Sequence, residues 1–469
     1  MSPKKITALT SNQAMAMLDV ATIAWTWPLT LAVASLSAEH STHGIADLLY
    51  PVAELVCLYA LGLYRRDVLV ATRKALGRAS LAAGLGAITA AGAVTLLHLT
   101  LGFEAGPVQD QPRLFASAIA SFLVSCTLAR IMFSILRHRG VFRRRLLVVG
   151  AGRRAWDLAW MLRKESSTLN YEIAFVHEPA LGEVDPRLAD GLSGSIVHLG
   201  AEDILDAARR LRADQIVVAP DERRGMNIES LLKCKIAGFP VYQYLSFVEM
   251  EIRRLDLKRM ELSWLLNSEG FYFGHIDRFF KRILDLAVSS VLLLAFVPFL
   301  LAAAVAIKLD DAGPVLYAQE RVTRNGRIFR IYKLRTMRVD AEQQGAVWAA
   351  NGDNRVTRVG AYLRRTRIDE MPQLFNVFRG DMSLVGPRPE RPAFVRALAE
   401  QIPLYHERHV VKAGLTGWAQ VNYPYGASID DARSKLSYDL YYVKNFSIQF
   451  DILVILQTIR VVFWPSGVH

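Results

Sequence analysis

The sequence predicts a membrane protein of mixed class: an N-terminal bundle of four transmembrane helices, a Rossmann-like parallel α/β domain, and an α-rich domain with a re-entrant membrane helix. Three observations support this: four apolar runs near the ~20 residues that span a bilayer, alternating strand and helix patterns after them, and a fifth apolar run interrupted by a proline. The 469 residues are 52% hydrophobic, yet carry a formal charge of +12. This combination is typical of a membrane protein with a cationic cytoplasmic face. A nucleic-acid partner is not expected, because no recognition module is evident.

Residues 1–139 contain the predicted bundle. Its four apolar runs are Met15 to Leu36, Ala46 to Tyr64, Leu81 to Leu101 and Leu114 to Leu136. Basic residues gather before the first run, between the second and third, and after the fourth, whereas Arg113 is the only Lys or Arg in the two opposite loops. The positive-inside rule therefore predicts that both ends of the bundle face the cytoplasm.

Residues 140–247 alternate between strand and helix patterns. The expected strands are 146–149, 171–176, 195–199, 215–219 and 240–244. The turn Gly150-Ala151-Gly152-Arg153-Arg154-Ala155 has the GxGxxA spacing that can place a dinucleotide pyrophosphate at a helix N-terminus. The same turn also simply packs a helix close to a strand, and the candidate ribose-binding acid, Glu178, lies beside Pro179. We therefore favour a structural or regulatory domain over a cofactor domain, followed by a connector over residues 248–276.

The fifth apolar run, about 284–309, contains Pro298 and is followed by many basic residues. A straight crossing would place those residues outside, against the positive-inside rule. A re-entrant helix that bends near Pro298 keeps both flanks inside. An ordinary fifth span with a proline kink is the alternative.

Further along, Asn325-Gly326 predicts a hairpin turn. The residues from Ser437 to Arg460 have helical spacing that suits either an interfacial membrane helix or a helix packed on the preceding domain. Between these features, Arg364 to Glu390 places Asp369 and Glu370 between a group of arginines and the segment Gly386-Pro387-Arg388-Pro389. Carboxylates beside several arginines are typical of a site that binds a phosphate ester and a metal ion. Solvated ion pairs on a protein surface would give a similar pattern.

Six motifs over residues 277–469 resemble the catalytic domain of one family. They are Lys281-Arg282-Ile283-Leu284-Asp285, Gly313-Pro314-Val315-Leu316-Tyr317-Ala318-Gln319, Tyr332-Lys333-Leu334-Arg335-Thr336-Met337, Ile368-Asp369-Glu370-Met371-Pro372-Gln373-Leu374, Gly380-Asp381-Met382-Ser383-Leu384-Val385-Gly386-Pro387-Arg388-Pro389, and Gly414-Leu415-Thr416-Gly417-Trp418-Ala419-Gln420-Val421. The family is the monotopic phosphoglycosyl transferases, the bacterial polyprenyl-phosphate hexose-1-phosphate transferases. The whole chain looks like the large subgroup that initiates exopolysaccharide synthesis, including the PEP-CTERM-associated members.

This resemblance implies an enzyme of the bacterial inner membrane with a cytoplasmic catalytic domain. It would transfer hexose-1-phosphate from a UDP-hexose to undecaprenyl phosphate, releasing UMP. Asp369 would be the nucleophile that forms a phosphosugar-aspartyl intermediate, Glu370 a neighbouring catalytic carboxylate, and Asp369 a ligand of Mg²⁺. We further assign substrate binding to five residues on the same basis. They are Lys333, Arg335, Arg364, Arg388 and Asp439.

The resemblance to exopolysaccharide initiators implies glucose as the expected sugar and galactose as the next candidate. No residue can be named from the sequence that would distinguish the hydroxyl configurations of the two sugars. A membrane-anchored nucleotide-binding regulator without turnover is the alternative of a different class. Membrane lipids are expected partners, and a homodimer is possible. Three departures from the family pattern, Asp311-Ala312, Thr323-Arg324 and Arg367, bear on specificity more than on reaction class.

Overall fold

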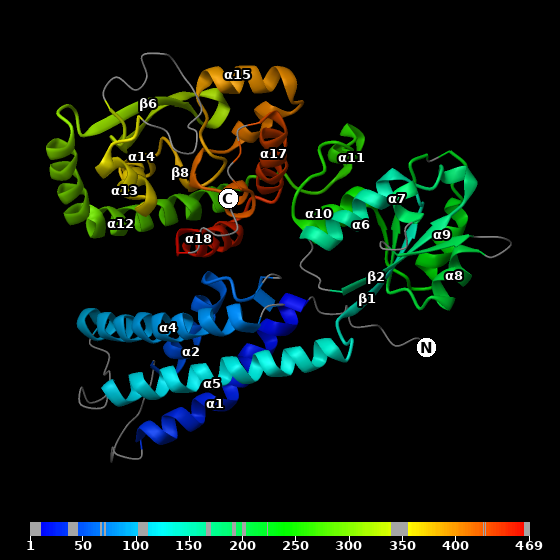
Figure 1. Ribbon diagram of the computed structural model, residues 1–469, viewed down its shortest axis with the longest axis horizontal. Helices are drawn as coiled ribbons and strands as arrows, with labels where there is room; N and C mark the ends of the chain where they lie inside the picture. Colours follow the sequence, from blue (N-terminus) through cyan, green and yellow to red (C-terminus); the bar gives the residue numbers. More distant parts are fainter. Residues whose placement is uncertain are drawn as a thin grey trace. The chain divides into compact units, whose positions relative to one another are not determined.

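A computed structural model provides the structure and describes residues 11–35, 46–65, 68–69, 72–101, 111–165, 170–189, 194–198, 203–222, 224–338, 355–424, 426 and 428–463. The chain folds into two compact units, Met1–Arg253 and Arg254–His469 (Figure 1). Each unit is described separately below. The finer division of the chain into four parts stays a prediction.

The first unit begins with a helical bundle. Its helices are α1 (Ser11–Ser35), α2 (Ala46–Ala60), α4 (Thr72–Leu101) and α5 (Gln111–His138). Three of them, α1, α4 and α5, are long and apolar enough to cross a membrane, and α12 (His275–Asp310) of the second unit is a fourth candidate. The predicted run 46–64 differs: α2 has 15 residues and a length of about 22 Å. It stops because Gly62 adopts a positive φ of 72° and Leu63 N–H bonds back to the Leu58 carbonyl, as at many helix ends.

Charged side chains lie inside this bundle. Arg130 of α5 donates to Asp19 of α1 over 2.7 Å, and both side chains are buried. Glu54 of α2 is also buried, at 1% exposure, and packs on Gly86 of α4, where no side chain would fit. Ionisable groups at membrane depth persist when they face the interior of a bundle. These residues therefore mark the faces through which α1 packs on α5 and α2 packs on α4.

The second part of the first unit is a parallel sheet, as predicted. Its strands are β1 (Arg143–Val149), β2 (Asn170–His177), β3 (Ser195–His198), β4 (Gln215–Val218) and β5 (Val241–Gln243), in the order β3-β2-β1-β4-β5. Their near-continuous apolar sequence suits strands covered on both faces. Helices α6 (Arg153–Glu165) and α10 (Tyr244–Ile252) pack together on one face, and α8 (Ile204–Arg210) and α9 (Ile228–Ile236) on the other (Figure 1).

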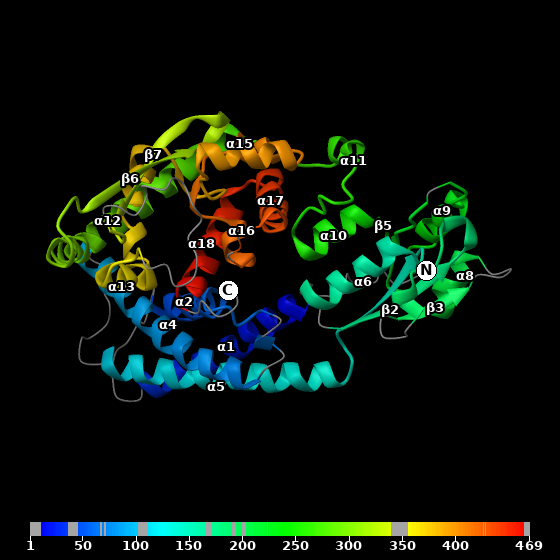
Figure 2. The same cartoon turned by 45° about the horizontal axis from the view of Figure 1, so that its top comes forward.

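The second unit starts with α12, a helix of 36 residues that contains Pro298 and whose ribbon bends between its two ends (Figure 1). Its side chains are largely exposed, for example Leu294 and Leu301. The hairpin of β6 (Leu316–Val322) and β7 (Ile328–Leu334) follows and lies beside α15 (Pro392–Gln401) (Figure 2). Asn325 and Gly326 both adopt positive φ at its turn, which confirms the predicted hairpin.

The rest of the second unit packs around three clusters of buried apolar residues within the described part of the chain. Its elements after the hairpin are α13 (Arg358–Thr366), η3 (Ile368–Glu370), α14 (Gln373–Arg379), β8 (Ser383–Val385), α15, η4 (Tyr405–Val410), β9 (Gly414–Thr416), α16 (Trp418–Asn422), α17 (Ile429–Lys444) and α18 (Ile448–Phe463). Tyr438, Tyr442 and Val454 are buried in one of these clusters. The helical pattern over 437–460 therefore belongs to two helices that pack on the domain.

Candidate active site

Asp369 and Glu370 lie in one short turn of 3₁₀ helix, η3, between α13 and α14. Arg367 adopts the left-handed conformation (φ 60°), ends α13 and turns the chain into η3. Successive side chains in a 3₁₀ turn point about 120° apart. The two carboxylates therefore face different surroundings, as their contacts show.

Glu370 is held between two cations. Lys333 Nζ, on β7, donates to Glu370 Oε1 over 2.7 Å, and Arg388 Nη2 lies 3.7 Å from the same oxygen. Burial alone would raise the pKa of Glu370, but these two positive charges outweigh it and hold this pKa well below its usual range. Glu370 is therefore ionised at neutral pH.

Asp369 has a different environment. Its exposed fraction is 7%, and within the described part of the chain no side chain donates a hydrogen bond to its carboxylate. Burial, and then the charge of Glu370, raise the pKa of Asp369 to about 6, although Lys333 and two nearby arginines partly offset this. A buried carboxylate without donors is open to a reacting group or a metal ion.

Arg364 and Arg367 are the two arginines that act on Asp369 electrostatically. Arg364 lies in α13, and its Nε donates to Thr336 Oγ1 over 2.9 Å, which fixes the guanidinium at the end of β7. Arg367 is exposed beside the carboxylates. With Lys333 and Arg388, four cations surround two carboxylates, so the site has surplus positive charge for an anionic ligand.

Two of the predicted binding residues, Arg335 and Asp439, make contacts within the protein. Arg335 is 7% exposed, donates to the carbonyls of Asp311 and Ala312, and so pins the loop between α12 and β6. Asp439 is 2% exposed on α17 and pairs with Arg408 over 2.7 Å. The structure thus brings Lys333, Arg364 and Arg388 to the carboxylates and places Arg335 and Asp439 in supporting contacts.

Sequence reasoning missed a buried asparagine that fixes the site. Asn376 of α14 is fully buried, donates to the Arg330 carbonyl over 2.8 Å and accepts from Tyr332 N–H at 3.1 Å. It thereby ties α14 to the strand that carries Lys333. A polar residue between the apolar Leu374 and Val377 on the inner face of α14 was the signal that could have identified it.

The Lys281–Asp285 motif is a second anchor. Asp285 Oδ1 accepts from Ser383 Oγ and Leu384 N–H, while Lys281 Nζ donates to the Val385 carbonyl and pairs with Asp451. Both residues belong to the start of α12 and hold β8. The apolar helix is therefore joined rigidly to the strand that leads into Gly386 and Arg388.

The GxGxxA turn of the first unit is filled by the chain itself. The N–H groups of Arg153 and Arg154, which open α6, donate to the two oxygens of Asp221 over 2.6 and 2.9 Å. Asp221 also lies against Gly152, where a side chain would not fit. A carboxylate thus occupies the helix N-terminus that a pyrophosphate would need. This supports the structural interpretation of the domain.

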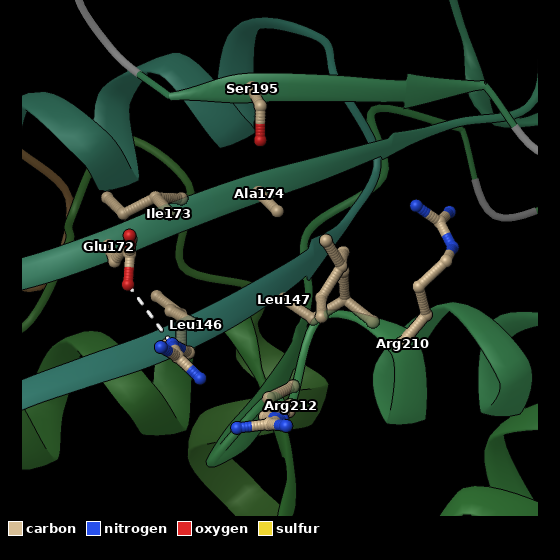
Figure 3. Close-up of a pocket in the computed structure, with 11 residues that line it drawn as sticks. Leu146, Leu147, Glu172, Ile173, Ala174, Ser195, Arg210 and Arg212 are labelled. Carbon is tan, nitrogen blue, oxygen red and sulfur yellow. Dashed lines mark hydrogen bonds and ion pairs between the residues drawn. The ribbon is translucent and has the colours of Figure 1, made fainter.

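A cavity of about 400 Å³ lies at the other end of the sheet (Figure 3). Its floor is apolar, with Leu146, Leu147 and Ile173, and Arg145 at its edge is paired with Glu172. Ligands of open α/β sheets bind at the carboxyl ends of the strands, whereas this cavity is lined by residues from the first and middle parts of β1 and β2, by the first residue of β3 and by residues that precede β4. The cavity is therefore separate from the GxGxxA turn.

Replacing Asp221 by Ala is expected to destabilise the protein by about 1–2 kcal/mol, because two helix N–H groups lose their acceptor. The full chain should show a lower Tm, whereas Asp206→Ala, at an exposed ion pair, should leave it unchanged. Calorimetry should detect no NAD⁺ binding to the unaltered protein. NAD⁺ binding with Asp221 in place would contradict the structural interpretation.

The described chain thus combines helices long and apolar enough to cross a membrane with two carboxylates that lie among four cations. Residues 276–465 match the family described as bacterial sugar transferase. The chain belongs to this family, the polyprenyl-phosphate hexose-1-phosphate transferases, as its motifs predicted.

Three named relatives have sequences similar to this chain. The chain is 43% identical over 262 residues to the UDP-N-acetylgalactosamine-undecaprenyl-phosphate N-acetylgalactosaminephosphotransferase of Aeromonas hydrophila, covering 55% of this chain and 60% of that one. It is 30% identical over 354 residues to the UDP-glucose:undecaprenyl-phosphate glucose-1-phosphate transferase of Klebsiella pneumoniae, covering 74% and 73%. It is 43% identical over 191 residues to the exopolysaccharide production protein PSS of Rhizobium leguminosarum bv. phaseoli, covering 39% and 95%.

Proposed function

We propose that this protein transfers hexose-1-phosphate from a UDP-hexose to undecaprenyl phosphate with release of UMP. The observation that carries the proposal is the buried Asp369 carboxylate, which has no side-chain donor in the described chain and adjoins a Glu370 held ionised by Lys333. Direct attack of one phosphate on another meets charge repulsion, and a carboxylate nucleophile divides the transfer into two steps.

In the first step a carboxylate oxygen of Asp369 attacks the sugar-bearing phosphorus of the UDP-hexose. The bond from that phosphorus to the bridging oxygen breaks, and UMP leaves with the bond's electron pair. In the second step an oxygen of undecaprenyl phosphate attacks the same phosphorus and displaces Asp369. The product is undecaprenyl diphosphate hexose, and the carboxylate is regenerated.

The cations support these steps by opposing the negative charge of the substrates. Lys333 and Arg388 form ion pairs with Glu370, and Arg364 and Arg367 lie close enough to Asp369 to lower its pKa. Fixed cations in a partly buried site stabilise charge that develops as the bond to UMP breaks. Arg335 is proposed to contribute through the loop that it pins.

Asp369 is also the residue that would hold Mg²⁺. Among the described residues no three His, Cys, Asp or Glu side chains gather into a metal site. Mg²⁺ often needs only one or two protein carboxylates, because substrate phosphates and waters complete its shell. The free Asp369 carboxylate fits this pattern, and bound Mg²⁺ would offset charge on the diphosphate.

The membrane arrangement follows from charge and from α12. We propose that α12 enters the inner leaflet of the bacterial inner membrane, bends near Pro298 and returns, which leaves the basic residues after it in the cytoplasm. Its exposed apolar side chains, such as Leu294 and Leu301, would then contact lipid. A soluble nucleotide sugar and the phosphate of a membrane lipid could both reach Asp369.

Glucose is the proposed sugar, supported by the Klebsiella relative's name, while the Aeromonas relative's name specifies N-acetylgalactosamine. The test is a panel of UDP-glucose, UDP-galactose, UDP-N-acetylglucosamine and UDP-N-acetylgalactosamine, assayed for UMP release with and without undecaprenyl phosphate. Release with UDP-glucose that depends on the lipid phosphate supports the proposal. Release with another sugar would change the sugar, and no release with any would overturn the reaction.

Activity is expected to rise with pH through about 6, because the nucleophile must lose its proton and the pKa of Asp369 is raised to about 6. Below that pH Asp369 is protonated, whereas Glu370 keeps its charge. The measurement is initial UMP release across this range. Arg367→Ser removes a positive charge that lowers the Asp369 pKa, so its acid limb should move to higher pH. An unchanged limb in this variant would contradict the assignment.

A further inference from the structure

The segment from Gly386 to Glu390, which carries Arg388, is held by a hydrogen bond at every residue. Gly386 N–H donates to the Thr416 carbonyl, and the carbonyls of Pro387 and Glu390 accept from Gly414 N–H and Val322 N–H, all over 2.9–3.0 Å. The carbonyls of the two remaining residues accept from arginine side chains. Arg408 Nη2 lies 3.0 Å from the Arg388 carbonyl, and Arg321 Nη1 lies 3.0 Å from that of Pro389.

Arg408 is itself fixed before it reaches this segment. It is 5% exposed, pairs through Nη2 with Asp439 Oδ2 over 2.7 Å, and donates through Nη1 to Tyr405 Oη over 2.7 Å. Asp439 is a buried residue of α17 and is the counter-ion of Arg408. A buried guanidinium paired in this way has one orientation, so the Arg388 carbonyl receives a fixed donor.

Arg321 is fixed by its own strand. On β6, Gln319 Nε2 donates to Tyr317 Oη over 2.7 Å, and Gln319 Oε1 accepts from Arg321 Nη2 over 2.6 Å. Residues two apart on a strand face the same side, so the three side chains form a row that ends at the Pro389 carbonyl. Tyr317 and Gln319 of the Gly313–Gln319 motif thus orient Arg321, which binds the residue after Arg388.

We propose that Arg408, oriented by Asp439, and Arg321 are positioning residues that present the Arg388 guanidinium to the phosphate of the substrate. The prolines on either side fix φ at 387 and 389 and restrict Arg388 to extended conformations. The two guanidinium groups then fix the direction of the peptide planes on which the Arg388 side chain is mounted. The proposal rests on the proposed function, and it assigns Asp439 a role without substrate contact.

The test is a double-mutant cycle in the full chain, reconstituted in membranes. Removing Arg408 alone would leave the Asp439 carboxylate buried without a partner, so both are replaced in Arg408→Leu/Asp439→Leu, which keeps the site apolar. We expect a loss of roughly 100-fold in kcat/KM, as for other small displacements of binding groups. The same replacement in an Arg388→Ala background should cause no further loss, because the group it positions is gone. A melting curve shows that each variant is folded.

Asp430→Leu/Arg433→Leu is the matched control. It removes a surface ion pair at the start of α17 by the same kind of replacement and leaves the bond to the Arg388 carbonyl, so kcat/KM should stay close to that of the unaltered protein. Losses that multiply in the Arg388→Ala background, or no loss in the Arg408→Leu/Asp439→Leu variant, would overturn the proposal.

UDP binding measured by calorimetry gives the same cycle without turnover. The Arg408→Leu/Asp439→Leu variant and Arg388→Ala should weaken UDP binding to a similar extent, and the combined variant no further. If the unaltered protein released no UMP with any sugar, the reaction would be overturned, while the binding cycle would still decide the positioning role. Equal UDP affinity in all variants would overturn the proposed positioning role of Arg408 and Asp439.

Discussion

Replacing Asp369 by Asn should abolish UMP release and lipid labelling, with a loss of roughly 10⁴-fold or more. The amide cannot attack phosphorus, and the charge that defines the site is removed. Nothing else in the described site replaces it, because Glu370 is engaged by Lys333 over 2.7 Å and has a low pKa. The measurement is transfer of label from the β-phosphate of UDP-glucose to protein and then to undecaprenyl phosphate.

The control for this variant is Asp430→Asn on α17, whose side chain is 83% exposed in a surface ion pair. It makes the same chemical change and should keep full activity, because exposed pairs contribute little. The labelled protein should also lose its label to hydroxylamine, as an acyl phosphate does. Label on the Asp369→Asn protein would show that another residue is the nucleophile.

Sequence motifs predicted which charges gather, but they did not show which of them touch. Lys333 and Arg335 lie two residues apart in one motif, yet Lys333 pairs with Glu370 whereas Arg335 is buried against Asp311 and Ala312. Both were expected to bind substrate. The difference arises because β7 ends at Leu334, so Arg335 turns toward the preceding loop.

Contacts between residues far apart in the sequence could not be predicted either. Asp221 caps α6 from 68 residues away in sequence, and Asp439 pairs with Arg408, which lies on another element and outside the six motifs. Neither pairing has a local pattern. In contrast, the parallel sheet and the turn at Asn325-Gly326 were predicted, because strand alternation and positive φ are local properties. The prediction extended the second apolar run to Tyr64, beyond the end of α2 at Ala60, because hydropathy alone does not detect the turn at Gly62.

Lys333→Met should lower kcat/KM by about 10²–10³-fold, the range seen when one charge-stabilising donor is removed from an active site. Lys333 is the first of the charges that oppose the effect of burial on Glu370, so its loss raises the pKa of this carboxyl. Glu370 would then take up a proton at a higher pH than before. Activity of the variant should therefore fall more steeply as the pH decreases, and initial rates across the acid range would measure this.

Lys333→Arg separates charge from shape in the same position. It keeps a positive charge near Glu370, so the low pKa of this carboxyl should be largely restored, while part of the loss in kcat/KM should remain because a guanidinium replaces a compact ammonium. Lys233→Met, at an exposed helix pair in the first unit, should have no effect. If Lys333→Met kept both its rate and its acid limb, the ion pair with Glu370 would have no part in catalysis. Glu370 would then owe its low pKa to Arg388 and Arg367.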